Sequence, residues 1–195
     1  MKIILGSQSP RRHELLKGLG VPFTWANIHA DEHYPSDLQG GDIPLYISRA
    51  KAQAYAQSLG ADELLITADT IVWLDGQVMG KPHDATNAKN MLRQLSGKTH
   101  QVYTGVSFAK KENGQFTLLD DYSFVDCTDV TFRNLTDDEI DYYIDTCNPL
   151  DKAGAYGVQE WIGYIGVTSL CGSYFNVMGF PTERVYQQLC RLSLL

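Results

Sequence analysis

The sequence has no long hydrophobic run. No stretch approaches the roughly 18 consecutive apolar residues that would span a bilayer. The first ten residues, MKIILGSQSP, turn polar too soon to resemble a secretory signal. We therefore expect a soluble, cytoplasmic protein with no membrane partner.

Paired cysteines are also missing. The four cysteines are scattered, form no CxxC pair and have no neighbouring histidines at metal-ligand spacing; they are Cys127, Cys147, Cys171 and Cys190. This pattern argues against a zinc site and against a disulfide framework. We therefore expect the four thiols to be reduced and most of them to be buried.

Positive charge is scarce, with 16 Lys and Arg against 23 Asp and Glu and a formal net charge of −7. Such a balance argues against a nucleic-acid partner, which needs a basic surface. A local cluster of basic residues could still hold a small anion. Neither GxxxxGK[ST] nor GxGxxG occurs, so any phosphate must be held in another way.

Segments with a strand pattern and segments with a helix pattern follow one another along the 195 residues. The Asp75-Gly76 and Asn113-Gly114 pairs indicate hairpin turns, which exclude a purely parallel sheet. We predict an α/β fold, a mixed twisted sheet with flanking helices, as one domain over residues 1–195 with two lobes and a central cleft. Helices are expected at about 11–19, 44–59, 85–95, 136–144 and from 181, strands at 2–5, 21–30, 64–67, 71–74, 102–109, 116–119 and 122–132, and loop and strand at 151–166.

The stretch SQSPRRHELL places two cations where a helix disfavours them. Ser9 is a candidate N-cap and Pro10 the first helical residue, so Arg11 and Arg12 fall in the first turn. Each cation there costs roughly 0.3–1 kcal/mol. A phosphate bound at the helix N-terminus would offset that cost. The alternative is that both side chains point into water.

Four more positions are candidates for a site. Asp69 stands among strand-forming residues, either in a turn with Thr70 or as a carboxylate aimed into a site. Lys51 either extends along its helix to solvent or reaches into a cleft. Lys81 in its loop is solvated unless it meets an anion. Glu32 matters only near a second carboxylate, since Mg²⁺ is held by one or two carboxylates with substrate phosphates.

Seven segments in order resemble the Maf family of nucleoside triphosphate pyrophosphatases: SQSPRR, RAKAQA, TADT, GKP, LSGKTHQVYTGV, DKAGAYGVQ and YFNVMGFP. The resemblance spans nearly the whole chain. It implies a fold like that of the inosine triphosphate pyrophosphatases. It also implies hydrolysis of a nucleoside triphosphate to the monophosphate and pyrophosphate, with a divalent metal, Mg²⁺ or Mn²⁺. DKAGAYGVQ is similar to the group acting on dTTP and UTP, whereas the methylated-GTP group usually has phenylalanine where this chain has Ala155-Tyr156.

The resemblance also implies roles for individual residues. Asp69 matches the proton acceptor and, with Glu32, a metal ligand. The phosphate-binding positions are Ser9, Arg11, Arg12, Lys51 and Lys81, and the positions linked to base and substrate choice are Arg11, Thr70 and Gln159. A Gln amide offers both a donor and an acceptor, which suits the O4/N3–H edge of thymine or uracil. Glu160, where glycine is frequent, adds negative charge near the expected base pocket.

Two other functions stay open at this point. One is a nucleotide-binding regulator of cell division with little catalysis, and the other is a pyrophosphatase for methylated GTP. Members of the family often form homodimers, and the aromatic-rich residues 161–174 fit either an interface or the core.

Overall fold

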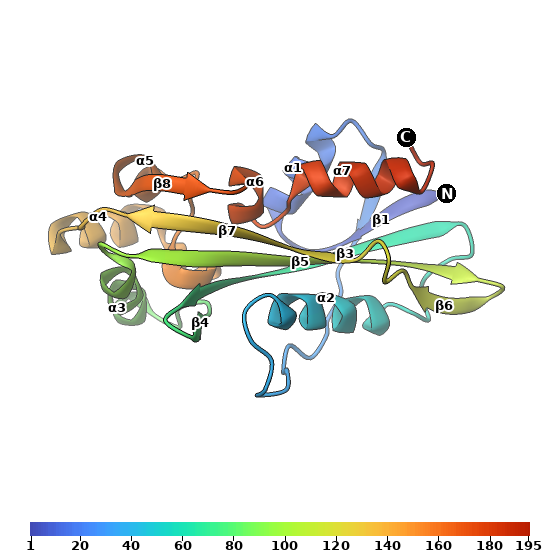
Figure 1. Cartoon of the computed structure of the whole chain (residues 1–195), viewed down its shortest axis with the longest axis horizontal. Coiled ribbons are helices and arrows are strands. Elements are labelled where there is room, and N and C mark those ends of the chain that lie inside the picture. Colours follow the sequence, from blue (N-terminus) through green and yellow to red (C-terminus); the bar gives the residue numbers. More distant parts are fainter. The chain divides into compact units, whose positions relative to one another are not determined.

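Eight strands form one mixed sheet in the computed structural model, which describes residues 1–195 (Figure 1). The order is β2-β1-β3-β5-β7-β8, with β4 paired to β3 and β6 to β5. β1 pairs in parallel with β2 and β3, whereas the β3/β4, β5/β6 and β7/β8 pairs are antiparallel. The strands are β1 (Lys2–Gly6), β2 (Phe23–Ala26), β3 (Glu63–Leu74), β4 (Gln77–Met79), β5 (Thr99–Glu112), β6 (Gln115–Leu118), β7 (Phe124–Phe132) and β8 (Val167–Cys171). The predicted mixed sheet is confirmed.

The helices flank these strands, and none is long and apolar enough to cross a membrane. They are α1 (Pro10–Gly18), α2 (Asp42–Ala54), α3 (Ala85–Leu95), α4 (Asp137–Cys147), α5 (Trp161–Gly166), α6 (Tyr174–Val177) and α7 (Thr182–Arg191), with 3₁₀ turns η1 (Pro149–Asp151) and η2 (Ala153–Ala155). The chain divides into two compact units. The first is Met1–Asp69, Thr104–Asp126 and Gly179–Leu195, and the second is Thr70–Tyr103 and Cys127–Met178.

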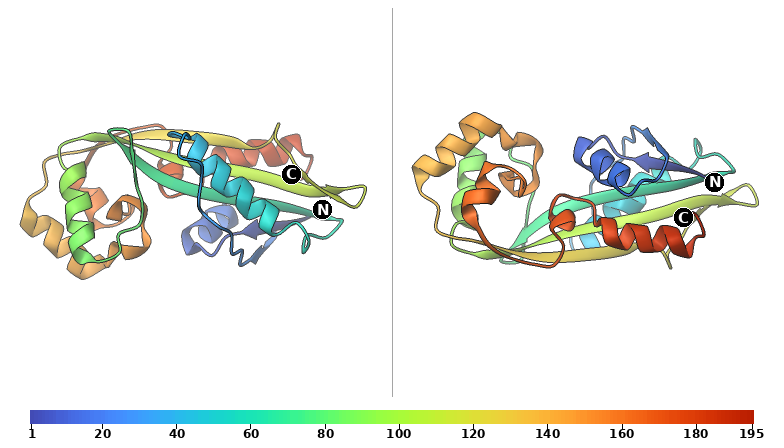
Figure 2. Two further views of the ribbon diagram at one scale, coloured as in Figure 1. Left: turned by 90° about the horizontal axis from the view of Figure 1, so that it is seen from below. Right: turned by 90° about the horizontal axis from the view of Figure 1, so that it is seen from above.

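The first unit has helices on both faces of its strands. Figure 2 shows α2 over the strands from one side and α1 with α7 from the other. Side chains alternate accordingly, because successive residues of a strand point to opposite faces. Ile3 of β1 packs in a cluster with Leu16 of α1 and Leu189 of α7. Its neighbour Ile4 packs in the cluster that includes Ala52 of α2.

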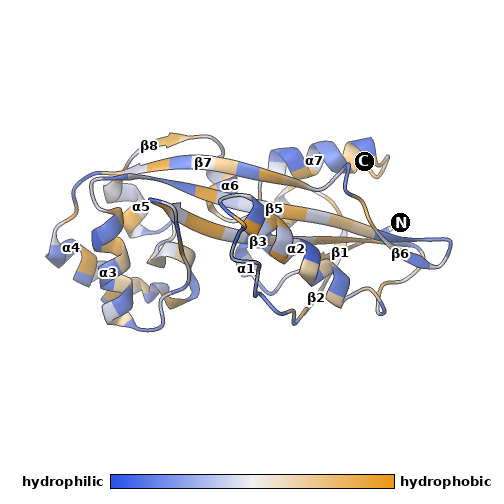
Figure 3. Ribbon diagram, turned by 60° about the horizontal axis from the view of Figure 1, so that its bottom comes forward, coloured by the Kyte–Doolittle hydropathy of each residue, from blue (hydrophilic) through white to orange (hydrophobic).

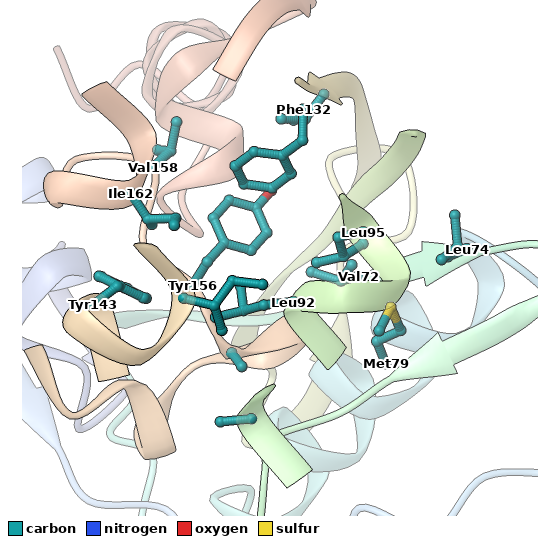
Figure 4. Close-up of a cluster of buried hydrophobic side chains, with 14 of the residues drawn as sticks. Val72, Leu74, Met79, Leu92, Leu95, Phe132, Tyr143, Tyr156, Val158 and Ile162 are labelled. Atoms are coloured by element: carbon teal, nitrogen blue, oxygen red, sulfur yellow. The ribbon is translucent and has the colours of Figure 1, made fainter. Parts of the chain in front are cut away.

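The second unit has its own hydrophobic core, built from the ends of long strands and from α3, α4 and α5 (Figure 4). Phe132 and Tyr156 meet edge to face there, with ring centroids 5.1 Å apart. α3 contributes Leu92 and Leu95, both fully buried, from one face of an amphipathic helix. Figure 3 shows hydrophobic and hydrophilic residues following one another along α3. The single domain and the central cleft stay predictions.

Local signals predicted several boundaries. Asp75-Gly76 and Asn113-Gly114 both take positive φ, which a tight hairpin turn requires. The Asp84 side chain accepts a hydrogen bond from the Asn87 backbone N–H at the start of α3. At the start of α4, Thr136 and Glu139 form a reciprocal capping box.

Other expectations were wrong. β3 runs unbroken through Asp69, so a turn there is excluded. The helix expected over 44–59 is shorter at its end: α2 ends at Ala54, and residues 55–58 continue only as turns. Residues 151–166 contain the expected loop, at 156–160, but 3₁₀ turns and α5 in place of the expected strand. The glycines and aromatics of this segment predicted loop and strand, but Gly154 takes a positive φ in a 3₁₀ turn and Gly163 allows α5 to approach the Val158 carbonyl closely.

The thiols form no disulfide, but none of them is buried, contrary to the expectation. Cys127, Cys171 and Cys190 are exposed and Cys147 is half-buried. Cys127 and Cys190 lie on the outward-facing sides of β7 and α7, where burial is not available. The aromatic segment is likewise mixed, since Tyr164 is 80% exposed while Ile162 is buried.

Candidate active site

The alternation of β3 aims three successive odd-numbered residues at α2. Leu65 packs in the same cluster as Ala52 of α2. Two residues on, the Thr67 hydroxyl donates to the backbone carbonyl of Ser48, at 2.7 Å. Two further, Asp69 reaches Lys51, three residues along the same helix. The same period-2 pattern that builds the core therefore delivers a carboxylate to a lysine.

Lys51 is the centre of this group. Its Nζ donates to Asp69 Oδ1 at 2.6 Å and lies 2.9 Å from Glu32 Oε1. The Lys51 and Asp69 side chains are each 14% exposed, whereas that of Glu32 is 59% exposed. Two carboxylates, one sheltered and one open to solvent, thus converge on one ammonium group.

The predicted turn at the start of α1 lies in the same unit. Ser9 is the N-cap residue and Pro10 occupies the first helical position, as predicted, although the Ser9 side chain makes no capping bond. The Ser7 hydroxyl instead accepts the Ser9 backbone N–H at 3.2 Å. His13 Nε2 lies 2.7 Å from the Ser7 carbonyl oxygen. The turn is therefore held by Ser7 and His13, and the Ser9 hydroxyl is not used for the helix.

Arg12 does not simply point into water. Its Nε–H donates to the Gly179 carbonyl and its Nη1 to the Ala68 carbonyl, both at 2.8 Å. These bonds tie α1 to the backbone beside Asp69. Burial lowers the pKa of the Arg12 guanidinium, and the Asp69 charge works against this lowering. Arg12 keeps its positive charge, because a guanidinium is not deprotonated in proteins.

Arg11 lies in the first turn of α1, in the first unit, and is half-buried. The other three predicted residues belong to the second unit. Thr70 follows Asp69 on β3 and is half-buried. Lys81 is exposed in the loop after β4, and Gln159 is half-buried in a turn. The loops that carry Lys81 and Gln159 are linked, since the Gly154 N–H donates to the Gly80 carbonyl at 3.0 Å.

Sequence reasoning missed the partners of several residues. Glu160 forms an ion pair with Lys152 at 3.0 Å and accepts from the Tyr143 hydroxyl. Its negative charge is therefore compensated inside the second unit. Nothing in the sequence pattern joins α4 to residues 152–160. The carbonyl partners of Arg12 were equally hidden, because backbone acceptors leave no mark on residue type.

The two carboxylates suit a hard divalent cation. No group of three or more His, Cys, Asp or Glu side chains is arranged to hold a metal ion. Asp69 and Glu32 nevertheless approach a common cation, Lys51, within hydrogen-bond distance. Mg²⁺ is commonly held by one or two carboxylates together with substrate phosphates. The donor set therefore fits such an ion only in company with a phosphorylated ligand.

These features define an α/β protein in which two carboxylates, one from a strand and one from a loop, meet a lysine of α2 beside a basic helix N-terminus. The profile of the Maf-like protein family matches residues 2–192. The chain therefore belongs to the Maf family, which confirms the resemblance read from its seven segments.

Relatives match over nearly the whole chain. A protein of Phocaeicola vulgatus named dTTP/UTP pyrophosphatase is 55% identical over 192 residues, covering 98% of this chain and 96% of that one. A protein of Bacteroides thetaiotaomicron with the same name is 54% identical over the same coverage. Among solved structures, the Staphylococcus aureus Ham1 protein is 12% identical with a TM-score of 0.46, covering 68% of this chain and 72% of that one.

Proposed function

We propose that this protein hydrolyses dTTP and UTP, and modified pyrimidine nucleotides, to the monophosphate and pyrophosphate. Such an activity clears unwanted nucleotides from the cellular pools. The observation that carries the proposal is the convergence of Asp69 and Glu32 on Lys51, beside Arg12 at the start of α1. The names of the relatives at 54–55% identity agree with it.

The proposed reaction begins with water near the α-phosphorus. Asp69 accepts a proton from that water as its oxygen attacks phosphorus. The bond from the α-phosphorus to the bridging oxygen breaks, and pyrophosphate leaves with that electron pair. Lys51 and Arg11 stabilise the negative charge that grows on the phosphate oxygens. A divalent metal held by Asp69 and Glu32, when bound, adds further neutralisation of that charge.

Several side chains would hold the triphosphate. In this proposal the Ser9 hydroxyl, which is not used to cap α1, hydrogen-bonds a phosphate oxygen. Arg12 adds positive charge beside the phosphates, from a guanidinium already oriented by two carbonyls. Lys81 provides a further cation from its loop.

We assign base selection to Gln159, with Arg11 and Thr70. The Gln159 amide can donate to O4 and accept from N3–H of thymine or uracil. A site that pairs with a defined base edge rejects analogues that leave its polar groups unpaired. A cytoplasmic location and homodimer formation complete the proposal.

The test is pyrophosphate release from a panel of dTTP, UTP, dCTP and methylated GTP with Mg²⁺ or Mn²⁺. We expect turnover of dTTP and UTP by the wild type. Asp69→Asn should lower kcat about 10²–10⁴-fold, the usual contribution of a general base. Asp62→Asn, which changes a mostly exposed carboxylate just before β3, is the matched control and should retain activity.

The other outcomes separate the alternatives. Turnover of methylated GTP in preference to dTTP would reassign the substrate. Nucleotide binding with no pyrophosphate release from any substrate would leave a binding protein and refute the enzyme. Circular dichroism of Asp69→Asn checks that any loss of turnover is not a loss of fold.

A further inference from the structure

Gln159 is the third residue of a closed turn. The Glu160 N–H donates to the Gly157 carbonyl at 3.0 Å, so residues 157–160 form a β-turn with Gln159 inside it. The two ends of this turn meet one side chain from another element. The Tyr143 hydroxyl of α4 accepts the Gly157 N–H at 3.0 Å and donates to the Glu160 carboxylate.

The Tyr143 side chain is suited to this bridging. It is fully buried in the core of the second unit, and Figure 4 shows it beside Ile162 and Tyr156. Burial, together with the hydrogen bond to Glu160, raises the pKa of the Tyr143 hydroxyl. The hydroxyl therefore stays protonated and can act as donor to Glu160 while it accepts from Gly157.

A buried ion pair completes the network. Lys152 Nζ lies 3.0 Å from Glu160 Oε1, and the Lys152 side chain is only 8% exposed. Its ammonium also donates to Asp151 at 2.7 Å. Lys152 and Glu160 stand at the two ends of the segment that contains Gln159, so the ion pair closes this segment into a loop.

The packing leaves the turn little room to shift. A Cβ on Gly157 would lie 2.8 Å from the Glu160 carboxyl carbon. A Cβ on Gly163 of α5 would lie 1.9 Å from the Val158 carbonyl oxygen. The Val158 carbonyl is backbone, so a side chain at Gly163 would force the segment to shift, whereas one at Gly157 would displace the Glu160 carboxylate from its place.

We propose that Tyr143, Lys152 and Glu160 are positioning residues, which fix the turn that carries Gln159 and so sharpen selection of the base. This inference rests on the proposed function. A glutamine amide can rotate so that its oxygen and its NH₂ group exchange places, and it can then pair with the edge of either cytosine or thymine. Discrimination between them therefore depends on how firmly the backbone and amide of Gln159 are held.

The experiment compares Tyr143→Phe with the wild type in kcat/KM for dTTP and for dCTP. Phenylalanine keeps the buried ring but removes the bridging oxygen. We expect the dTTP:dCTP ratio to fall about tenfold, chiefly through KM for dTTP. Tyr142→Phe is the matched control, because Tyr142 is adjacent on α4 but 53% exposed. Its ratio should equal that of the wild type.

The ratio separates positioning from mere stability. Both constants are measured on the same preparation, so a smaller folded fraction lowers them equally and leaves the ratio unchanged. Glu160→Gln is the second variant: it keeps an acceptor for the Tyr143 hydroxyl but loses the charge that pairs with Lys152. We expect an intermediate ratio for it, between those of Tyr143→Phe and the wild type.

Each result decides between the two proposals. A wild-type ratio in both variants would overturn the positioning role and leave the proposed function intact. An inactive wild type would overturn the proposed function and the positioning role together. A lowered ratio in Tyr143→Phe but not in Tyr142→Phe supports the network.

Discussion

His100 makes the stability of this protein depend on pH in a predictable window. The imidazole is fully buried in the second unit, with Nε2 2.7 Å from the Tyr156 hydroxyl and the ring stacked on Phe132. Its Nδ1 has no hydrogen-bond partner. Burial lowers the pKa of His100 to about 4, against which Asp129 acts only weakly. The folded protein therefore keeps His100 neutral where the unfolded chain would protonate it.

The sign and size of the effect follow from this difference. Because the folded-state pKa is lowered, the contribution of His100 to stability is complete above pH 6.5 and is lost as the pH falls toward 4. Each pH unit inside the window costs about 1.4 kcal/mol. Between pH 7.5 and pH 5 the free energy of unfolding should fall by about 2 kcal/mol.

The assay is urea unfolding from pH 7.5 to 5, with His100→Gln as the comparison. Glutamine cannot titrate but can still bond to the Tyr156 hydroxyl. Between pH 7.5 and pH 5, the free energy of unfolding of His100→Gln should fall by about 2 kcal/mol less than that of the wild type. His29→Gln, at an exposed histidine, should keep the wild-type slope. Parallel curves for wild type and His100→Gln would refute the reasoning.

Three further substitutions test the elements that position the site. Gly105→Ala should cost about 1–3 kcal/mol in thermal unfolding, because a Cβ would lie 2.3 Å from the Leu45 backbone nitrogen of α2; an unchanged Tm would contradict this packing. Lys51→Met removes the ammonium group that pairs with the sheltered Asp69 carboxylate, and should lower the free energy of unfolding in urea by about 1–3 kcal/mol. This value lies between the costs of breaking an exposed and a buried ion pair. Thr136→Ala removes one half of the capping box and should cost about 1 kcal/mol by the same urea assay, with activity retained.

Much of the fold could be predicted because local chemistry decides it. Asp75 and Asn113, each followed by glycine, predict hairpin turns, because these short polar residues tolerate positive φ. Residues 151–166 could not be predicted in this way. Ala155 takes positive φ without being glycine, which happens only where the surroundings impose it. The pattern of residue types therefore does not predict the secondary structure of this segment correctly.

Sequence reasoning predicts candidate site residues but not the contacts that they make, and the site itself stays a prediction. Asp69 stands out in the sequence because an acidic residue is disfavoured in a strand, and β3 does run through it. Its partnership with Lys51 depends on the face of β3 against which α2 packs, which no local signal specifies. Lys81, Gln159 and the phosphate-binding roles stay predictions. The bridging by Tyr143 was hidden for the same reason as the Lys51 contact, since it joins distant elements.

The charges around Lys51 bear on how an acidic protein can hold a polyanion. Asp69 and Glu32 would repel a triphosphate, yet they stand next to the cations proposed to bind it. While Lys51 is paired with both carboxylates, its ammonium group is poorly placed to bind a phosphate. A divalent cation on the carboxylates would release Lys51 for the nucleotide and end the repulsion at once. On the proposed function, metal and nucleotide should therefore each raise the affinity for the other by the same factor.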